Sequence, residues 1–136
     1  MTALPSVSDL PHVGSELLSE ILDPARTALV LVDVQVDFVS PDGVIGQAGV
    51  DLRPAHIAMA QMARLREALK QKSGTICFLK VVTRDETDTD ALKNLYAWRG
   101  KPGQHAICRA DEAGSDYYQL VPEDGDLDIA KVLFDG

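Results

Sequence analysis

Residues 27–38, TALVLVDVQVDF, constrain the fold more than any other stretch of this chain. Four consecutive apolar residues, 29–32, end abruptly at Asp33, and Gln35 and Phe38 follow within five positions. A short apolar run rich in β-branched residues is typical of a strand that is buried on both faces of a parallel sheet. In an open α/β sheet, the residues that follow such a strand lie at the carboxyl edge, where ligands bind. The sequence therefore predicts a functional site around Asp33.

Two further segments have the composition of strands in the same sheet. Residues 75–82, TICFLKVV, are mostly apolar, and residues 127–134, LDIAKVLF, contain Lys131. A helix is expected between the first and second strands, from near Pro54 to about residue 72, because apolar residues recur there at helical spacing. Strand, helix and strand in this order form a right-handed parallel crossover. These segments predict an α/β fold.

The expected helix from Pro54 presents one apolar face to the core. That face carries four residues at helical spacing: Ala58, Met62, Leu65 and Leu69. Residues 39–53 contain a Pro-Asp-Gly turn and further glycines, so we expect a long loop there. A second helix is expected within residues 86–98, whose first positions are acidic, and a short turn or helix near residues 116–120.

The chain divides into an N-terminal extension, residues 1–24, and one domain, residues 25–136. The extension contains SELLSEIL, residues 15–22, which predicts a short helix with Ser15 as its N-cap. No signal-peptide pattern opens the chain and no apolar run is long enough to span a bilayer, so a cytoplasmic location is expected. The formal charge of -8 over 136 residues argues against nucleic-acid and membrane partners. We expect small molecules or proteins as partners instead.

The cysteines and histidines form no recognisable metal or disulfide pattern. Cys77 lies inside the second predicted strand and is interpreted as a small buried hydrophobic residue. Cys108 precedes Arg109, and a nearby cation can lower a thiol pKa, but no His or Asp around it forms a recognisable dyad. The three histidines lack ligand spacing: His12, His56 and His105. We therefore expect neither a metal nor another cofactor.

Asp33 and Lys131 both fall near the carboxyl ends of strands in the predicted sheet. One interpretation is a surface salt bridge, which is worth little. The other is functional, because a carboxylate held beside an ammonium group stays ionised at neutral pH and can accept a proton from a thiol in front of it. Spacing alone leaves both interpretations open.

Several motifs, in order along residues 25–136, resemble the first half of the isochorismatase-like cysteine hydrolases. They are TALVLVDVQVDF, the glycine-bearing loop, the helix closing at LKQKSG, the second strand, the SDYYQLVPEDGDLDIAK passage and the final KVLFDG. The resemblance implies a doubly wound parallel sheet of the Rossmann-type three-layer kind, truncated here to about its first three strands. Its amidase branch implies hydrolysis of a small amide or related C–N bond by an oligomeric enzyme without a cofactor.

The same resemblance assigns roles to particular residues. By motif position, Asp33 matches the aspartate and Lys131 the lysine of an Asp–Lys–Cys triad, whose thiolate attacks an amide carbonyl to give an acyl-enzyme. Gln35 and Phe38 would line the substrate pocket beside the aspartate. Trp98 would form a further wall of the pocket, or equally belong to the core.

The family's nucleophile is the one element without a counterpart. It follows the lysine, beyond a further strand, whereas both cysteines of this sequence precede Lys131.

In the family's strand order the first strand is central, so we expect residues 1–136 alone to expose an open sheet edge and to be poorly soluble, oligomeric or incompletely folded. Two alternatives stay open: a catalytically inactive form acting as an interaction or regulatory module, and a small enzyme that uses Cys108 or acid–base chemistry alone.

Overall fold

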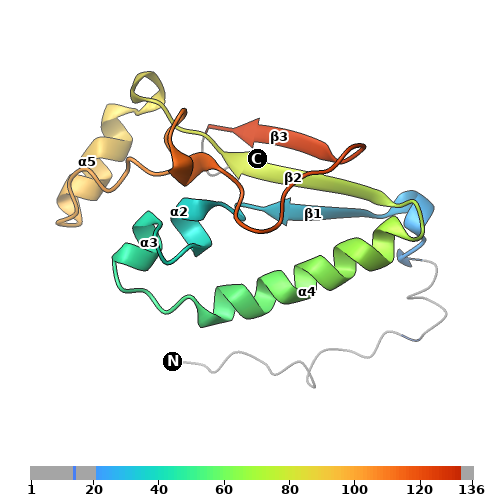
Figure 1. Ribbon diagram of the computed structural model, residues 1–136. Helices are drawn as coiled ribbons and strands as arrows, with labels where there is room; N and C mark the ends of the chain where they lie inside the picture. Colours follow the sequence, from blue (N-terminus) through green and yellow to red (C-terminus); the bar gives the residue numbers. More distant parts are fainter. Residues whose placement is uncertain (1–13, 15–20, 133–136) are drawn as a thin grey trace.

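Three parallel strands form the centre of the structure. The computed structural model describes Gly14 and residues 21–132. Strands β1 (Ala28–Val32), β2 (Thr75–Val81) and β3 (Leu127–Lys131) lie side by side in the order β1-β2-β3, as Figure 1 shows. All three predicted strands are present and the α/β prediction is confirmed. The helix expected over residues 15–22 lies almost wholly outside the described residues.

Helix α4 (Arg53–Lys70) covers one face of this sheet. Its start, with Pro54 in the first turn, agrees with the predicted helix, because proline fits the first helical position. The buried core beneath α4 consists of Leu31, Ile76 and Phe78, with partly buried residues such as Met62 around them. The strand–helix–strand unit therefore forms a parallel crossover, as expected.

The opposite face of the sheet is covered less completely. The register aligns Val30, Cys77 and Leu127 in one row, and Val32, Leu79 and Ile129 in the next. Aligned residues of neighbouring strands point to the same side, so these rows form one apolar face. Val30 is 50% exposed and Val32 is 45% exposed. The prediction that the first strand is buried on both sides is therefore wrong for the described residues, which leave this part of the face open.

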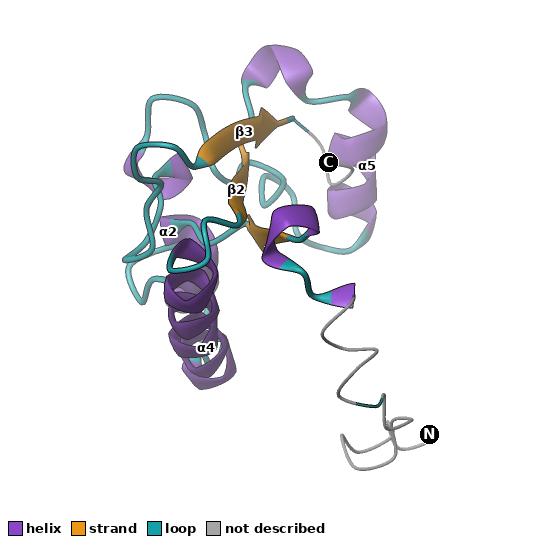
Figure 2. Cartoon of the chain, turned by 90° about the vertical axis from the view of Figure 1, so that its right-hand side faces the viewer, coloured by secondary structure: helices purple, strands orange, loops and turns teal. Residues whose placement is uncertain are grey.

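Helix α5 (Asp90–Trp98) lies beyond the carboxyl ends of the strands (Figure 1) and on the side of the sheet away from α4 (Figure 2). It begins at Asp90, four residues after the start of the predicted range, because the side chain of Thr89 accepts a hydrogen bond from the Leu92 N–H and caps the first turn there. Because α5 lies at the end of the sheet, it leaves Val30, Val32 and Ile129 about half exposed. No helix in the described part of the chain is long and apolar enough to cross a bilayer.

The predicted core face of α4 is only partly correct. Met59 and Arg66 are its buried residues, whereas Leu65 is 57% exposed. The reason is an unexpected role for Arg66, whose guanidinium lies 5.1 Å from the centre of the Phe78 ring and 2.8 Å from the Asp126 carboxylate. Arg66 therefore occupies a core position where an aliphatic residue was expected, and its ion pair with Asp126 connects the loop before β3 to α4.

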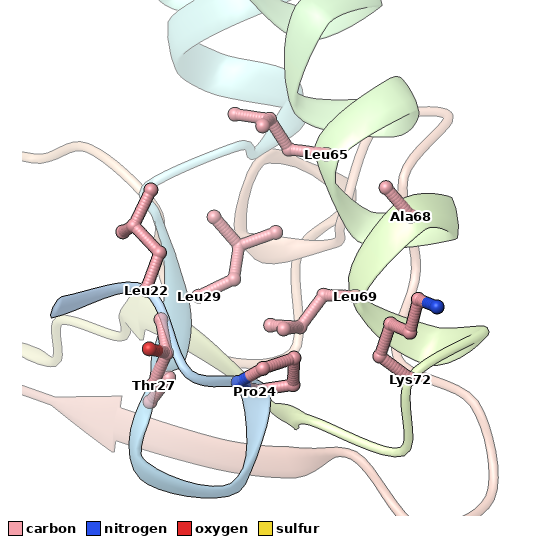
Figure 3. Close-up of a pocket in the computed structure, with 9 residues that line it drawn as sticks. Leu22, Pro24, Thr27, Leu29, Leu65, Ala68, Leu69 and Lys72 are labelled. Atoms are coloured by element: carbon pink, nitrogen blue, oxygen red, sulfur yellow. The ribbon is translucent and has the colours of Figure 1, made fainter. Parts of the chain in front are cut away.

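Leu65 lines a groove instead of the core. The groove measures about 350 Å³ and lies between α4, the start of β1 and the short 3-10 helix η2 (Pro24–Arg26). Figure 3 shows Leu22, Leu29 and Leu65 around it, with Lys72 at its rim. It opens beside the edge of β1, at the opposite end of the strand from Asp33.

The segments between the main elements are more ordered than predicted. Helices α2 (Val36–Val39) and α3 (Val44–Gln47) follow β1, where residues 39–53 were expected to form a loop. A Cβ atom at Gly43 would lie 2.0 Å from the Val36 carbonyl oxygen, so glycine is what allows these short helices to approach so closely. Short 3-10 helices also occur at η3 (Asp85–Thr87) and η4 (Ala113–Ser115), the latter slightly before the turn expected near residues 116–120.

Candidate active site

Asp33 and Lys131 meet at the carboxyl edge of the sheet. Asp33 directly follows β1, and Lys131 is the last residue of β3. The Lys131 Nζ atom lies 3.3 Å from the Asp33 Oδ2 atom, with side-chain exposures of 9% and 27% respectively. Because β2 lies between the two strands, the lysine side chain reaches across the end of β2 to form this ion pair. The expectation that both residues lie together at this edge agrees with the structure, and their catalytic roles stay a prediction.

The backbone of Asp33 directs its side chain to this position. Asp33 has a φ of 57°, in the left-handed region, and its N–H donates a 2.8 Å hydrogen bond to the Leu79 carbonyl. If β1 continued regularly, the next side chain would point to the face opposite that of Val32 and Lys131. Left-handed conformations of residues other than glycine are uncommon and occur often at functional sites. Here the conformation turns the carboxylate toward the lysine.

The two oxygens of the Asp33 carboxylate have different surroundings. Oδ2 forms the ion pair with Lys131, whereas Oδ1 is buried and accepts no hydrogen bond from the described residues. Leaving a buried acceptor without a donor costs about 1–3 kcal/mol. The arrangement therefore provides a carboxylate that Lys131 fixes at the sheet edge and whose side chain stays partly exposed.

Gln35 lies at the centre of a hydrogen-bond network beneath the site. It is fully buried, and its Nε2 donates to the carbonyls of Val81 at 2.7 Å and Ser115 at 2.8 Å. Its Oε1 accepts a 2.8 Å hydrogen bond from the Val81 N–H. Both polar atoms of the Gln35 amide form hydrogen bonds to backbone groups, so Gln35 connects the segment after β1 with the end of β2 and with η4. Contact between Gln35 and a substrate stays a prediction.

The two aromatic candidates belong to different helices. Phe38 belongs to α2 and its side chain is half-buried. Trp98 is the last residue of α5 and is 84% exposed, so it belongs neither to the core nor to an enclosed pocket wall of the described chain. Their roles in substrate binding stay predictions.

Asp37 is a buried residue of the site that the sequence reasoning did not single out. Its Oδ2 accepts a 2.7 Å hydrogen bond from the Cys108 N–H, and its Oδ1 accepts a 3.3 Å bond from the Val44 N–H. The available signal was a charged residue four positions after Asp33, between the apolar residues Val36 and Phe38. A buried carboxylate of this kind is retained in a fold only when it is hydrogen-bonded.

Cys108 lies near this carboxylate but is not activated as a nucleophile. Cys108 is fully buried, and its backbone has a φ of 50°. Burial, followed by the charges of Asp37 and Asp33, raises the pKa of the Cys108 thiol to about 12. The expectation that Arg109 lowers this pKa is wrong, because its guanidinium lies 2.5 Å from the carboxylate of Asp88.

Asp88 is the buried partner in a second charged cluster. The hydrogen bond from Arg109 is the main reason that the pKa of Asp88 lies below its ordinary value. His105 also approaches Asp88, with its Nε2 atom 3.4 Å from the carboxylate. Across Gly14 and residues 21–132, no group of three or more His, Cys, Asp or Glu side chains is arranged to hold a metal ion.

No protein-family model matches this chain, and a search of curated proteins gives no match either. The chemistry of the site therefore has to be inferred from the geometry of this chain.

Proposed function

We propose that this chain provides the base and the lysine of an isochorismatase-like cysteine hydrolase that acts on a small amide or related C–N bond. The observation that carries the proposal is the Asp33–Lys131 ion pair at the carboxyl edge of a parallel sheet, where the Asp33 side chain is 27% exposed. Ligands of open α/β sheets bind at this edge. The motif resemblance along residues 25–136 supports the same assignment.

The geometry suits the following reaction. Asp33 accepts the proton of a cysteine thiol, and the thiolate attacks the carbonyl carbon of the amide. The C–N bond then breaks, and Asp33 returns the proton to the leaving amine. Water hydrolyses the resulting thioester and regenerates the thiol. Lys131 orients the Asp33 carboxylate and balances its charge throughout.

The thiol is proposed to come from outside residues 1–136. Cys108 is fully buried, and its raised pKa makes it a weak nucleophile at neutral pH. Cys77 is buried within β2, away from the carboxyl end of that strand. Both placements disfavour the alternative in which Cys108 serves as the nucleophile.

The finer fold assignment belongs to the same proposal. All-parallel sheets are normally covered on both faces, whereas Val30, Val32 and Ile129 are about half exposed here. In the complete doubly wound, three-layer fold, further strands would pair with the edge of β1 and helices would cover this face. We expect the functional protein to be a homo-oligomer in the cytoplasm that binds a small amide and uses no cofactor.

A second candidate function is a catalytically inactive interaction or regulatory module. The same half-exposed apolar face favours it, because exposed apolar surface combined with an unpaired strand edge is suited to binding another chain. In that case the Asp33–Lys131 pair has a structural role alone.

Substitutions at the ion pair test the two candidates. The expression product of the complete reading frame is assayed for amine or ammonia release from a panel of small amides. We expect Asp33→Asn and Lys131→Met to lower kcat/KM by roughly 10²-fold or more, as is typical for loss of acid–base catalysis.

Lys80→Met is the matched control for this experiment. Lys80 lies in the same sheet, where its Nζ atom is 3.6 Å from the carboxylate of Asp128, and the register places it on the face opposite Lys131. We expect it to keep most of the activity. Equal activity in all variants would contradict the hydrolase proposal, and a lack of hydrolysis together with binding to another chain would favour the interaction module.

A further inference from the structure

The carboxylate of Asp37 joins parts of the chain that are far apart in sequence. It belongs to α2, immediately after the Asp33 segment, and accepts backbone N–H groups from Val44 at 3.3 Å and Cys108 at 2.7 Å. The first comes from the start of α3 and the second from the loop after α5. The Asp37 side chain thus connects the segment after β1 with a loop inside the connection between β2 and β3.

The hydrogen bonds continue from Cys108 to the lysine of the site. The Cys108 carbonyl accepts a 2.9 Å hydrogen bond from the Thr83 N–H, just after β2. One residue earlier, the Val82 N–H donates a 2.9 Å hydrogen bond to the Lys131 carbonyl. Asp37 is therefore linked to the backbone of Lys131 through the chain at the end of β2.

Close backbone packing leaves little freedom to the Asp37 side chain. A Cβ atom at Gly114 would lie 2.3 Å from Asp37 Oδ2, and one at Gly43 would lie 2.7 Å from Asp37 Cα. The loop on the far side is also constrained, because Cys108 adopts a φ of 50° while its N–H points to the carboxylate. The carboxylate thus sits in a close-fitting site made largely of backbone.

We propose that Asp37 is a positioning residue that sets the relative placement of Asp33 and Lys131. It acts by holding the Cys108 loop, and through this loop the end of β2, against the segment that carries Asp33. This inference rests on the proposed hydrolase function for its catalytic consequence, but not for its structural one. Asp37 itself touches neither the substrate nor the reacting atoms.

Hydrogen exchange provides a test that does not depend on activity. Asp37→Ala removes both acceptors, whereas Asp37→Asn keeps one oxygen but presents an NH₂ group to one of the two N–H donors. We expect exchange at the Cys108 and Val82 amides to accelerate by roughly tenfold or more in Asp37→Ala and by less in Asp37→Asn. The amide of Met62, within α4, serves as the reference for global stability.

Kinetics on the expression product of the complete reading frame provide the second measurement. We expect kcat to fall by roughly tenfold or more in Asp37→Ala with KM changed less than threefold, and Asp37→Asn to recover part of kcat. Asp42→Ala is the matched control, because it removes an exposed carboxylate from the turn between α2 and α3.

The outcomes separate the two proposals. Faster exchange at Cys108 alone, with Val82 unchanged, would overturn the positioning role of Asp37. A parallel acceleration at Met62 would also overturn it, since that result indicates general destabilisation. If the wild-type protein hydrolyses no amide but Val82 responds as expected, the positioning role stands and the hydrolase proposal fails.

Discussion

Replacing Gln35 by methionine tests how the carboxyl edge is held together. Methionine has nearly the same volume as glutamine but offers no amide, so Gln35→Met removes the side-chain partner of three backbone groups, two of them buried and one part-buried. These groups are the N–H and carbonyl of Val81 and the carbonyl of Ser115. The substitution isolates the hydrogen bonds, because it creates no large cavity.

The expected cost follows from the number of orphaned groups. Each buried group left without a partner costs about 1–3 kcal/mol, so the three together cost about 3–5 kcal/mol at the lower end of that range. Burying a methionine in place of an amide offsets about 1 kcal/mol of this loss. A net loss of about 2–4 kcal/mol is a large fraction of the 5–15 kcal/mol that stabilises a typical domain.

Urea unfolding followed by far-UV circular dichroism measures this loss. With a slope of about 1–3 kcal/mol per molar urea, the midpoint should fall by at least about 0.7 M. Gln47→Met is the matched control, because the Gln47 amide donates to the Asp42 carbonyl at an exposed position of α3. We expect a change of about 0.5 kcal/mol or less for this control, as is usual for surface substitutions.

A glutamate at the same position gives a complementary test. Gln35→Glu retains an acceptor for the Val81 N–H but directs a carboxylate at two carbonyl oxygens. We expect a loss as large as that of Gln35→Met at neutral pH, and a smaller loss at acidic pH, where a protonated carboxyl can donate one hydrogen bond. A Gln35→Met protein as stable as the Gln47→Met control would refute the reasoning.

Four further predictions concern stability, reactivity and association. The folded-state pKa values of Asp88 and Asp126 are lowered, and for Asp126 burial acts in the opposite direction but is outweighed by hydrogen bonds. The free energy that these two carboxylates contribute to folding is therefore complete above about pH 4 and is lost as the pH falls further. Urea midpoints between pH 6 and 2.5 measure this loss, and a midpoint that does not change with pH would contradict the prediction. The Cys108 thiol, with its pKa raised to about 12, should resist iodoacetamide at pH 8 until the protein unfolds, which mass spectrometry reports. Gly114→Ala places a Cβ against a buried carboxylate and should lower the thermal midpoint by several degrees, corresponding to about 1–3 kcal/mol, and an unchanged midpoint would show that the loop yields. Ile129→Lys should reduce self-association of residues 1–136 in sedimentation velocity, because it places a charge on the open apolar face, whereas a monodisperse wild-type monomer would contradict that expectation.

The sequence predicted the sheet because its strands are short apolar runs that end in polar residues. The run before Asp33 and the one at residues 75–82 both became strands, and the proline near residue 54 marked the start of α4. These signals are local, and the structure preserves them. The placement of Asp33 beside Lys131 was also within reach, because carboxyl ends of parallel strands share one edge.

The features that the sequence did not predict depend on contacts between distant segments. Arg66 occupies a core position because Phe78 and Asp126 surround its guanidinium, and no periodicity within the helix reveals them. Asp37 binds the backbone of Cys108, far along the chain, so its role cannot be read from neighbouring residues. Helix α3, within residues 39–53, was missed because the glycines of that segment indicate turns, whereas here Gly43 permits close packing of α2 and α3.

The order of the strands has a consequence for how the site assembles. Each strand pairs with its predecessor in the sequence, so β1 and β2 can associate during synthesis before β3 has been made. The carboxylate and the ammonium, however, flank the first and last of the three strands, and they come together only when β3 has docked. Formation of this pair therefore reports that β3 has docked, and chains in which β3 has not yet docked hold the Asp33 carboxylate without its cation.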